Sequence, residues 1–191
     1  MTTNLVDTMR GTTGQTTDIN KNQPNLSAPR TQASSRKLPV FLLSNIQSFG
    51  NSEKTNKTTE IEAILDINNV DVACFTETWL NNVSKDQLIM NNYVNFHFVR
   101  ENVSKVSGGV TISVNKNIPS CKLDIDVPEH IECLWISMRP KWLPRAISNI
   151  IVAGIYYPGS NSIYAPNQED ILLHITESVQ KICKTPIYFN G

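Results

Sequence analysis

The sequence predicts a single α/β domain that begins near Leu38 and follows a polar tail. Two observations support this prediction. From Leu38 onward, short β-type runs alternate with helical patterns, whereas residues 1–37 contain no aromatic side chain and are rich in Thr, Asn, Ser and Gln. A segment of that composition buries too little apolar area to offset the entropy of ordering it. We therefore expect residues 1–37 to be disordered and residues 38–191 to form the domain.

The first part of the domain has the pattern strand, helix, strand. Residues 39–45 form a short apolar run that ends in polar residues, and residues 58–69 carry Ile and Leu at helical spacing. Residues 70–78 read VDVACFTET, and their near-continuous apolar content is typical of a strand buried on both faces.

The second part of the domain is dominated by strand patterns. Further strands are expected at 95–99, 108–115, 132–138, 148–158 and, last in the chain, 186–189. A helix is expected over 165–183, with Asn167 as its N-cap and Asp170 three residues on. The apolar residues predicted to share one face of this helix are Ile171, Leu172, Ile175, Val179 and Ile182.

Composition bounds the function classes. The chain has 17 basic and 17 acidic residues and no net charge, so it lacks the global basic signature of many nucleic-acid-binding proteins. It shows no apolar signal segment after Met1 and no run of the ~20 apolar residues that a membrane span needs. The four Cys are far apart without CxxC spacing, which favours reduced thiols. We expect a cytoplasmic or nuclear protein without a membrane partner.

Polar side chains end several of the predicted strands. Asn45, Glu77, Tyr156, Tyr157 and Asn190 hold such positions. In α/β folds, ligands gather at the carboxyl ends of strands, where distant parts of the sequence converge. Glu77 stands out because an unpaired buried carboxylate costs several kcal/mol or takes up a proton. A bound cation would be one such partner of Glu77.

The strand and helix segments, taken in order, resemble a known family. LLSNIQSF, TTEIEAILDINNVDVACFTETWL, SGGVTISV, ECLWISM and IIVAGIYYPGS resemble the endonuclease/exonuclease/phosphatase superfamily, and within it the apurinic-type endonuclease domain of non-LTR retrotransposons. The resemblance spans nearly all of 38–191. It implies a two-sheet α/β sandwich and a Mg²⁺-dependent phosphodiester hydrolase site that acts on DNA, without a small-molecule cofactor.

The resemblance also implies roles for individual residues. Glu77 takes the position of the family's metal-ligating Glu, and Asn45 that of an Asn that orients the metal site or the phosphate. Tyr156 falls where the family has a Tyr that contacts the scissile phosphate, and Asn190 matches the Asn of a Gly-Asp-x-Asn motif. Taken alone, Asn45 is typical of a turn and Tyr156 of a core.

The match to the family is incomplete at its C-terminal end. Tyr188 stands where the motif has Asp, and no segment corresponds to the family's final Asp and Asp-His residues. A phenol with a pKa near ~10 cannot act as a carboxylate at neutral pH. His97, His130 and His174 have ordinary sequence contexts and are not expected to act as general bases. The expectation is a C-terminally truncated endonuclease domain that binds Mg²⁺ and DNA weakly and is weakly active or inactive.

Two other functions remain open from the sequence. One is a phosphoesterase for a small-molecule or lipid phosphate, and the other is a non-catalytic remnant that binds nucleic acid weakly. Arg100 and Glu132 are expected to form an ion pair or to be solvated charges, with a DNA-backbone contact by Arg100 as the alternative.

Overall fold

The computed structural model describes residues 38–50, 57–100, 107–159, 162 and 166–184. The described residues all belong to one unit, 35–191. The predicted tail, the predicted strand 186–189 and the residues Tyr188 and Asn190 lie outside the described residues.

This unit is a mixed α/β structure, as the sequence predicted. Its elements, in chain order, are β1 (Phe41–Asn45), α1 (Lys57–Ile67), β2 (Val72–Thr76), α2 (Ser84–Gln87), β3 (Tyr93–Phe98), β4 (Val110–Asn115), β5 (Ser120–Lys122), β6 (Glu132–Met138), β7 (Ile150–Tyr156) and α3 (Gln168–Lys184). The bounds of β6 coincide with the predicted strand. Asn167 caps α3 as expected, because its Oδ1 accepts a hydrogen bond of 3.2 Å from the Glu169 amide.

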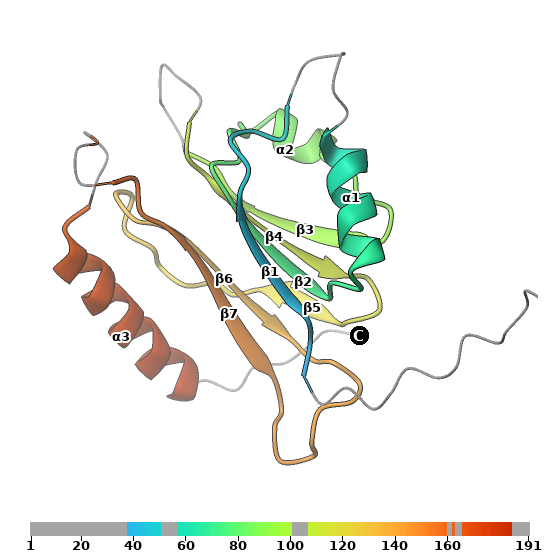
Figure 1. Ribbon diagram of the computed structural model, residues 1–191. Helices are drawn as coiled ribbons and strands as arrows, with labels where there is room; N and C mark the ends of the chain where they lie inside the picture. The colour runs from blue at the N-terminus through green and yellow to red at the C-terminus, as the bar shows by residue number, and fades with distance from the viewer. Residues whose placement is uncertain (1–37, 51–56, 101–106, 160–161, 163–165, 185–191) are drawn as a thin grey trace, which may run out of the picture. The chain divides into compact units, whose positions relative to one another are not determined.

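The strands form two sheets (Figure 1). The first has the order β1-β2-β4-β3, in which β1 and β2 are parallel and the other pairs antiparallel. The second has the order β5-β6-β7 and is antiparallel throughout. Among the described strands, β1, β3, β5 and β7 are therefore edge strands.

Alternating side chains fill the space between the two sheets. The apolar cluster there comprises Val72, Val110, Ile112, Val114, Ile118, Leu134, Ile136 and Met138, with Cys74, Ile150, Val152 and Tyr156 against it. Within β6, the even-numbered positions face this cluster, which places Glu132 on the same inward face as Leu134. Gly154 permits the close approach of the sheets, since a Cβ there would lie 2.8 Å from Val110 Cγ1 and 2.9 Å from Cys74 Sγ.

Helices cover the outer faces of both sheets (Figure 1). Leu65 of α1 belongs to an apolar cluster with Ala73 and Phe75 of β2. On the other side, Ile171, Ile175 and Ile182 of α3 pack against β6 and β7.

The prediction for the buried face of α3 was partly wrong. Leu172 is 64% exposed and Val179 45% exposed, whereas His174 and Ser178 are buried. The buried face follows the helical spacing of Ile171, His174, Ile175, Ser178 and Ile182. The polar His174 is tolerated there because its Nε2 lies 3.4 Å from Trp135 Nε1 in the outer core.

Three further findings concern short elements, the cysteines and membrane-spanning helices. The sequence patterns did not predict β5 or α2, which have three and four residues. All four cysteines are free, with Cys133 buried and Cys183 exposed. Burial raises the pKa of Cys74 to about 11 and that of Cys133 to about 12, so both thiols are protonated at neutral pH.

None of the helices in the described part of the chain is long and apolar enough to cross a membrane.

Candidate functional site

The site is built around Glu77, which directly follows β2. The parallel register pairs Asn45 with Thr76, so the carboxyl ends of β1 and β2 lie side by side. Beyond the strands, the amides of Ile46, Ser48 and Phe49 donate to the carbonyls of residues 76, 77 and 78 at 3.1, 2.7 and 3.2 Å. Glu77 therefore emerges between two loops that are bonded to each other.

Three protein donors hold the Glu77 carboxylate. The Tyr156 hydroxyl donates to Oε1, the Trp79 indole Nε1–H donates to Oε2 at 2.6 Å, and the Gly108 amide donates to Oε2 at 3.0 Å. The donors come from β7, from the loop after β2 and from the loop before β4. We expected a cation as the partner of Glu77, but the described residues already satisfy much of its hydrogen-bonding capacity.

Asn45 lies at the end of β1, opposite Thr76, and its side chain is exposed. Its Oδ1 accepts a hydrogen bond of 3.3 Å from the Gln47 amide, a local contact typical of a turn. The structure thus brings Glu77 and Tyr156 into contact and places Asn45 at the adjacent strand end, beside Thr76. The fourth predicted site residue, Asn190, lies outside the described residues.

Backbone strain is concentrated at this edge of the sheet. Gln47, Ser48, Glu77 and Trp79 have φ values of 47°, 85°, 56° and 54°, in the left-handed region that side chains other than glycine rarely adopt. Each such residue costs roughly 1–3 kcal/mol, and such strain clusters at functional sites. Only Asn69, elsewhere in the described chain, is a further non-glycine residue of this kind.

A second carboxylate lies beside the first. Glu132, 5% exposed, begins β6 directly opposite Tyr156 in β7. Its Oε1 accepts from Arg100 Nε at 2.8 Å and from Arg100 Nη2, and its Oε2 accepts from the Gly109 amide at 2.5 Å. Arg100 Nη1 donates to Ser107 Oγ at 3.0 Å. The predicted ion pair is therefore confirmed, and the prediction of solvated charges is wrong because both side chains are enclosed.

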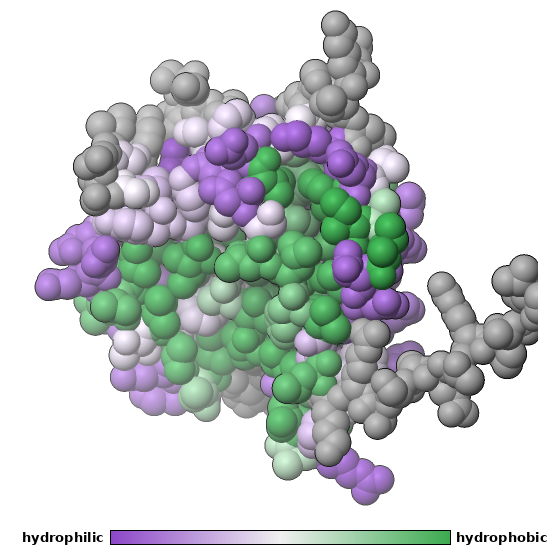
Figure 2. Space-filling view, in the orientation of Figure 1, coloured by the Kyte–Doolittle hydropathy of each residue, from purple (hydrophilic) through white to green (hydrophobic). Residues whose placement is uncertain are grey.

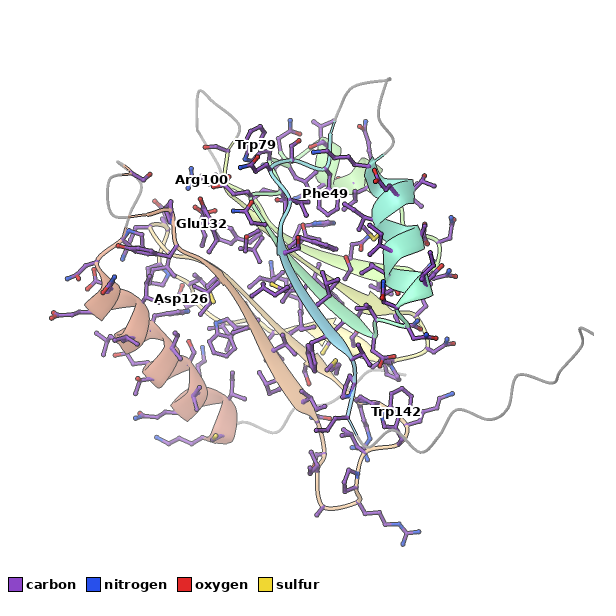
Figure 3. All side chains as sticks on the ribbon, in the orientation of Figure 1. Phe49, Trp79, Arg100, Asp126, Glu132 and Trp142 are labelled. Atoms are coloured by element: carbon purple, nitrogen blue, oxygen red, sulfur yellow. The ribbon has the colours of Figure 1, made fainter. Side chains whose placement is uncertain are left out.

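Figure 3 shows Trp79, Arg100 and Glu132 near one another toward one end of the strands. Burial raises the pKa of Glu132 above its ordinary value, while the Gly109 amide and the Arg100 guanidinium oppose that shift. The nearby Glu77 charge adds to the raising effect, which reflects how close the two carboxylates lie.

The histidines are engaged away from Glu77. His97 Nδ1 lies 2.9 Å from Thr111 Oγ1, His130 Nε2 lies 3.8 Å from Asp170 Oδ2, and His174 lies against Trp135. None of these contacts involves Glu77, and the expectation that the three histidines do not act as general bases stays a prediction.

The residues present fit a weakly held Mg²⁺ ion. Among the described residues, no group of three or more His, Cys, Asp or Glu could hold a metal ion. Glu77 Oε1 and Asn45 Oδ1 each accept one hydrogen bond from the described residues, so each oxygen retains a lone pair. Mg²⁺ commonly keeps several waters and binds through one or two protein oxygens plus a substrate phosphate. Two oxygens are compatible with that mode of binding.

Comparisons with known proteins add no family assignment. The sequence matches no protein-family model, and no curated protein matches it.

Proposed function

We propose that the ends of β1, β2 and β7 form the site of a Mg²⁺-dependent phosphodiester hydrolase of the DNA endonuclease type. The observation that carries the proposal is the Glu77 carboxylate, fixed in a strained backbone by donors from three separate segments, one of them the hydroxyl of Tyr156. Backbone strain of this kind clusters at active sites, where it is part of the mechanism.

Each residue has a role that its position supports. Glu77 and Asn45 supply the oxygens for the cation, which would neutralise charge that develops on the phosphoryl oxygens. Tyr156 orients Glu77 through its hydroxyl and is placed to donate to a phosphate oxygen if that hydrogen bond opens. Exposed Trp79, whose indole edge is fixed on Glu77, borders the same site.

We propose that catalysis by these 191 residues is weak. No described histidine or second free carboxylate lies beside Glu77 to act as a general base, because Glu132 is committed to Arg100 and Gly109. A positioned base is worth about 10²–10⁴ in rate, and stabilisation of developing charge by further groups is worth a comparable factor.

Metal binding is the sharpest test of this proposal. We would titrate the full chain with Mg²⁺ by calorimetry and compare Glu77→Gln, which removes the charge, with Glu60→Gln, an exposed Glu on α1. We expect weak binding in the wild type, no detectable binding in Glu77→Gln, and unchanged binding in Glu60→Gln. Equal affinity in all three proteins would refute Glu77 as the ligand.

Nicking of supercoiled plasmid DNA tests the proposed activity. We expect cleavage barely above background with Mg²⁺, and none with Glu77→Gln. Robust cleavage that Glu77→Gln retains would place the activity elsewhere. Robust cleavage that Glu77→Gln abolishes would support the site and contradict the proposed weakness.

A further inference from the structure

The turn at Gly108 and Gly109 connects the two carboxylates of the site. These two successive amides donate to different acceptors, Gly108 to Glu77 Oε2 at 3.0 Å and Gly109 to Glu132 Oε2 at 2.5 Å. Both glycines have positive φ, 70° and 86°. The two amides belong to adjacent peptide planes that join at the Gly108 Cα, so the two hydrogen bonds together fix the backbone of the turn on both carboxylates.

Glu132 is more deeply buried than Glu77. It faces the interior between the sheets, its Oε1 receives two donors from Arg100, and Arg100 in turn is tied to Ser107 just before the turn. Both guanidinium donors converge on this one oxygen, and such charge-assisted hydrogen bonds are stronger than those between neutral groups. The ion pair thus clamps both ends of the segment that precedes β4.

The turn at Gly108 and Gly109 is also hydrogen-bonded to the backbone of the loop after β2. The Trp79 amide donates to the Gly108 carbonyl at 3.0 Å, and the Trp79 indole reaches Glu77. A Cβ at Gly108 would lie 2.6 Å from Glu132 Oε2 and 2.7 Å from Arg100 Cζ, so the turn is seated directly on the ion pair.

We infer that Glu132, held by Arg100, is a positioning residue for Glu77. Glu132 fixes the Gly108–Gly109 turn. The Gly108 amide and the Trp79 indole then hold the Glu77 carboxylate in the orientation that binds the cation. This inference rests on the proposed function for its consequence in metal binding, but its structural part stands independently. Groups that orient a metal ligand typically change metal affinity by about 10–100-fold when removed.

The test uses the full chain labelled with ¹⁵N. The indole Nε1–H resonance of Trp79, identified by its loss in Trp79→Phe, reports on the contact with Glu77, and the Gly108 amide resonance reports on the turn. Glu132→Gln and Glu132→Asp are compared with Glu129→Gln, an exposed Glu in the loop before β6. Mn²⁺ is the metal probe, and its affinity is read from paramagnetic broadening of nearby resonances.

We expect both Glu132 variants to shift the Trp79 indole and Gly108 resonances in the absence of metal and to weaken Mn²⁺ binding about tenfold. Glu129→Gln should change neither. Glu132→Asp keeps the charge and serves if Glu132→Gln does not fold. A folded Glu132 variant with unchanged Trp79 and Gly108 resonances would overturn the inference.

The measurement of Mn²⁺ affinity distinguishes failure of this inference from failure of the proposed function. If wild-type protein does not bind Mn²⁺, the proposed function fails, and shifted resonances would establish only that Glu132 fixes the turn and its contact with Glu77. If the resonances shift and Mn²⁺ affinity stays unchanged, Glu132 has a structural role only and the inference is wrong.

Discussion

Substitution of Gly109 by Ala tests how tightly the site is built. Gly109 has φ of 86°, and a Cβ added there would lie 2.6 Å from Thr78 Oγ1 and 3.2 Å from the Phe98 carbonyl oxygen. Thr78 is fully buried, so its side chain has little room to move away. Gly109→Ala therefore introduces both a strained backbone and a steric clash.

The expected cost is the sum of two contributions. A left-handed conformation costs a residue other than glycine about 1–2 kcal/mol, and overpacking in a filled interior costs about 1–3 kcal/mol. Together they predict a loss of about 2–5 kcal/mol in the free energy of unfolding. For a folded unit of this size, each kcal/mol lowers Tm by about 2–4 °C.

Urea unfolding followed by circular dichroism measures this loss, and Thr78→Ala separates its two parts. Because Thr78→Ala removes the clashing oxygen, we expect Gly109→Ala to cost about 1–3 kcal/mol less in that background than in the wild type. Gly159→Ala is the control, since a Cβ at Gly159 meets no atom within 4 Å. A Gly109→Ala protein within about 0.5 kcal/mol of the wild type would refute the reasoning.

Two further predictions concern other parts of the unit. Burial lowers the pKa of His97 from 6.5 to about 4. Below pH 6.5 the unfolded chain therefore takes up a proton that the folded state does not bind. This difference predicts that up to about 3 kcal/mol of stability, fully present above pH 6.5, is lost as the pH falls from 6.5 to 4. Unfolding measured across that range should show a flatter pH dependence in His97→Gln, and an equal slope would contradict this assignment. Leu43 on the edge strand β1 is 77% exposed, so Leu43→Lys should reduce self-association measured by light scattering while leaving Tm nearly unchanged. Unaltered light scattering would show that β1 does not mediate association.

The second of these predictions concerns a broad hydrophobic area on the face where β1 and β7 run (Figure 2). Leu38, Phe41 and Leu43 contribute to it with exposures of 65%, 52% and 77%. The even-numbered residues Val40 and Leu42 pack against the cluster below α1, so the odd-numbered residues of β1 face away from that core. Apolar side chains on an unpaired edge favour association, and a lysine there opposes it.

Regular patterns in the sequence predicted much of the fold. The seven-residue run ECLWISM became β6 with the same bounds, and the Asn167 cap marked the start of α3. Elements as short as β5 and α2 span too few residues to show a period, so no pattern could reveal them. The exposed Leu172 shows that apolar identity alone does not define a buried helix face.

The candidate site was predictable only in part. The strand-end position and the family resemblance singled out Asn45, Glu77 and Tyr156, and the structure places these three at one edge. Their proposed roles in binding and catalysis remain predictions. No local signal indicated the left-handed conformations of Glu77 and Trp79, because neither residue type favours them. The connection through Gly108 and Gly109 depends on loops brought together by the tertiary fold.

The contacts of Glu132 explain why the strained residues at these strand ends can persist. Glu132 enters the interior with a guanidinium and an amide as partners, and an enclosed ion pair is costly to disrupt once formed. That pair anchors the glycine turn, and the turn supplies an amide to Glu77 and a carbonyl to Trp79. A series of hydrogen bonds thus connects the strained residues to the buried Glu132 carboxylate, whose oxygens are hydrogen-bonded. Glu77, by contrast, keeps an oxygen with remaining capacity at the strand ends, which is the chemical condition for the proposed binding of a cation while the Gly108 and Trp79 donors stay in place.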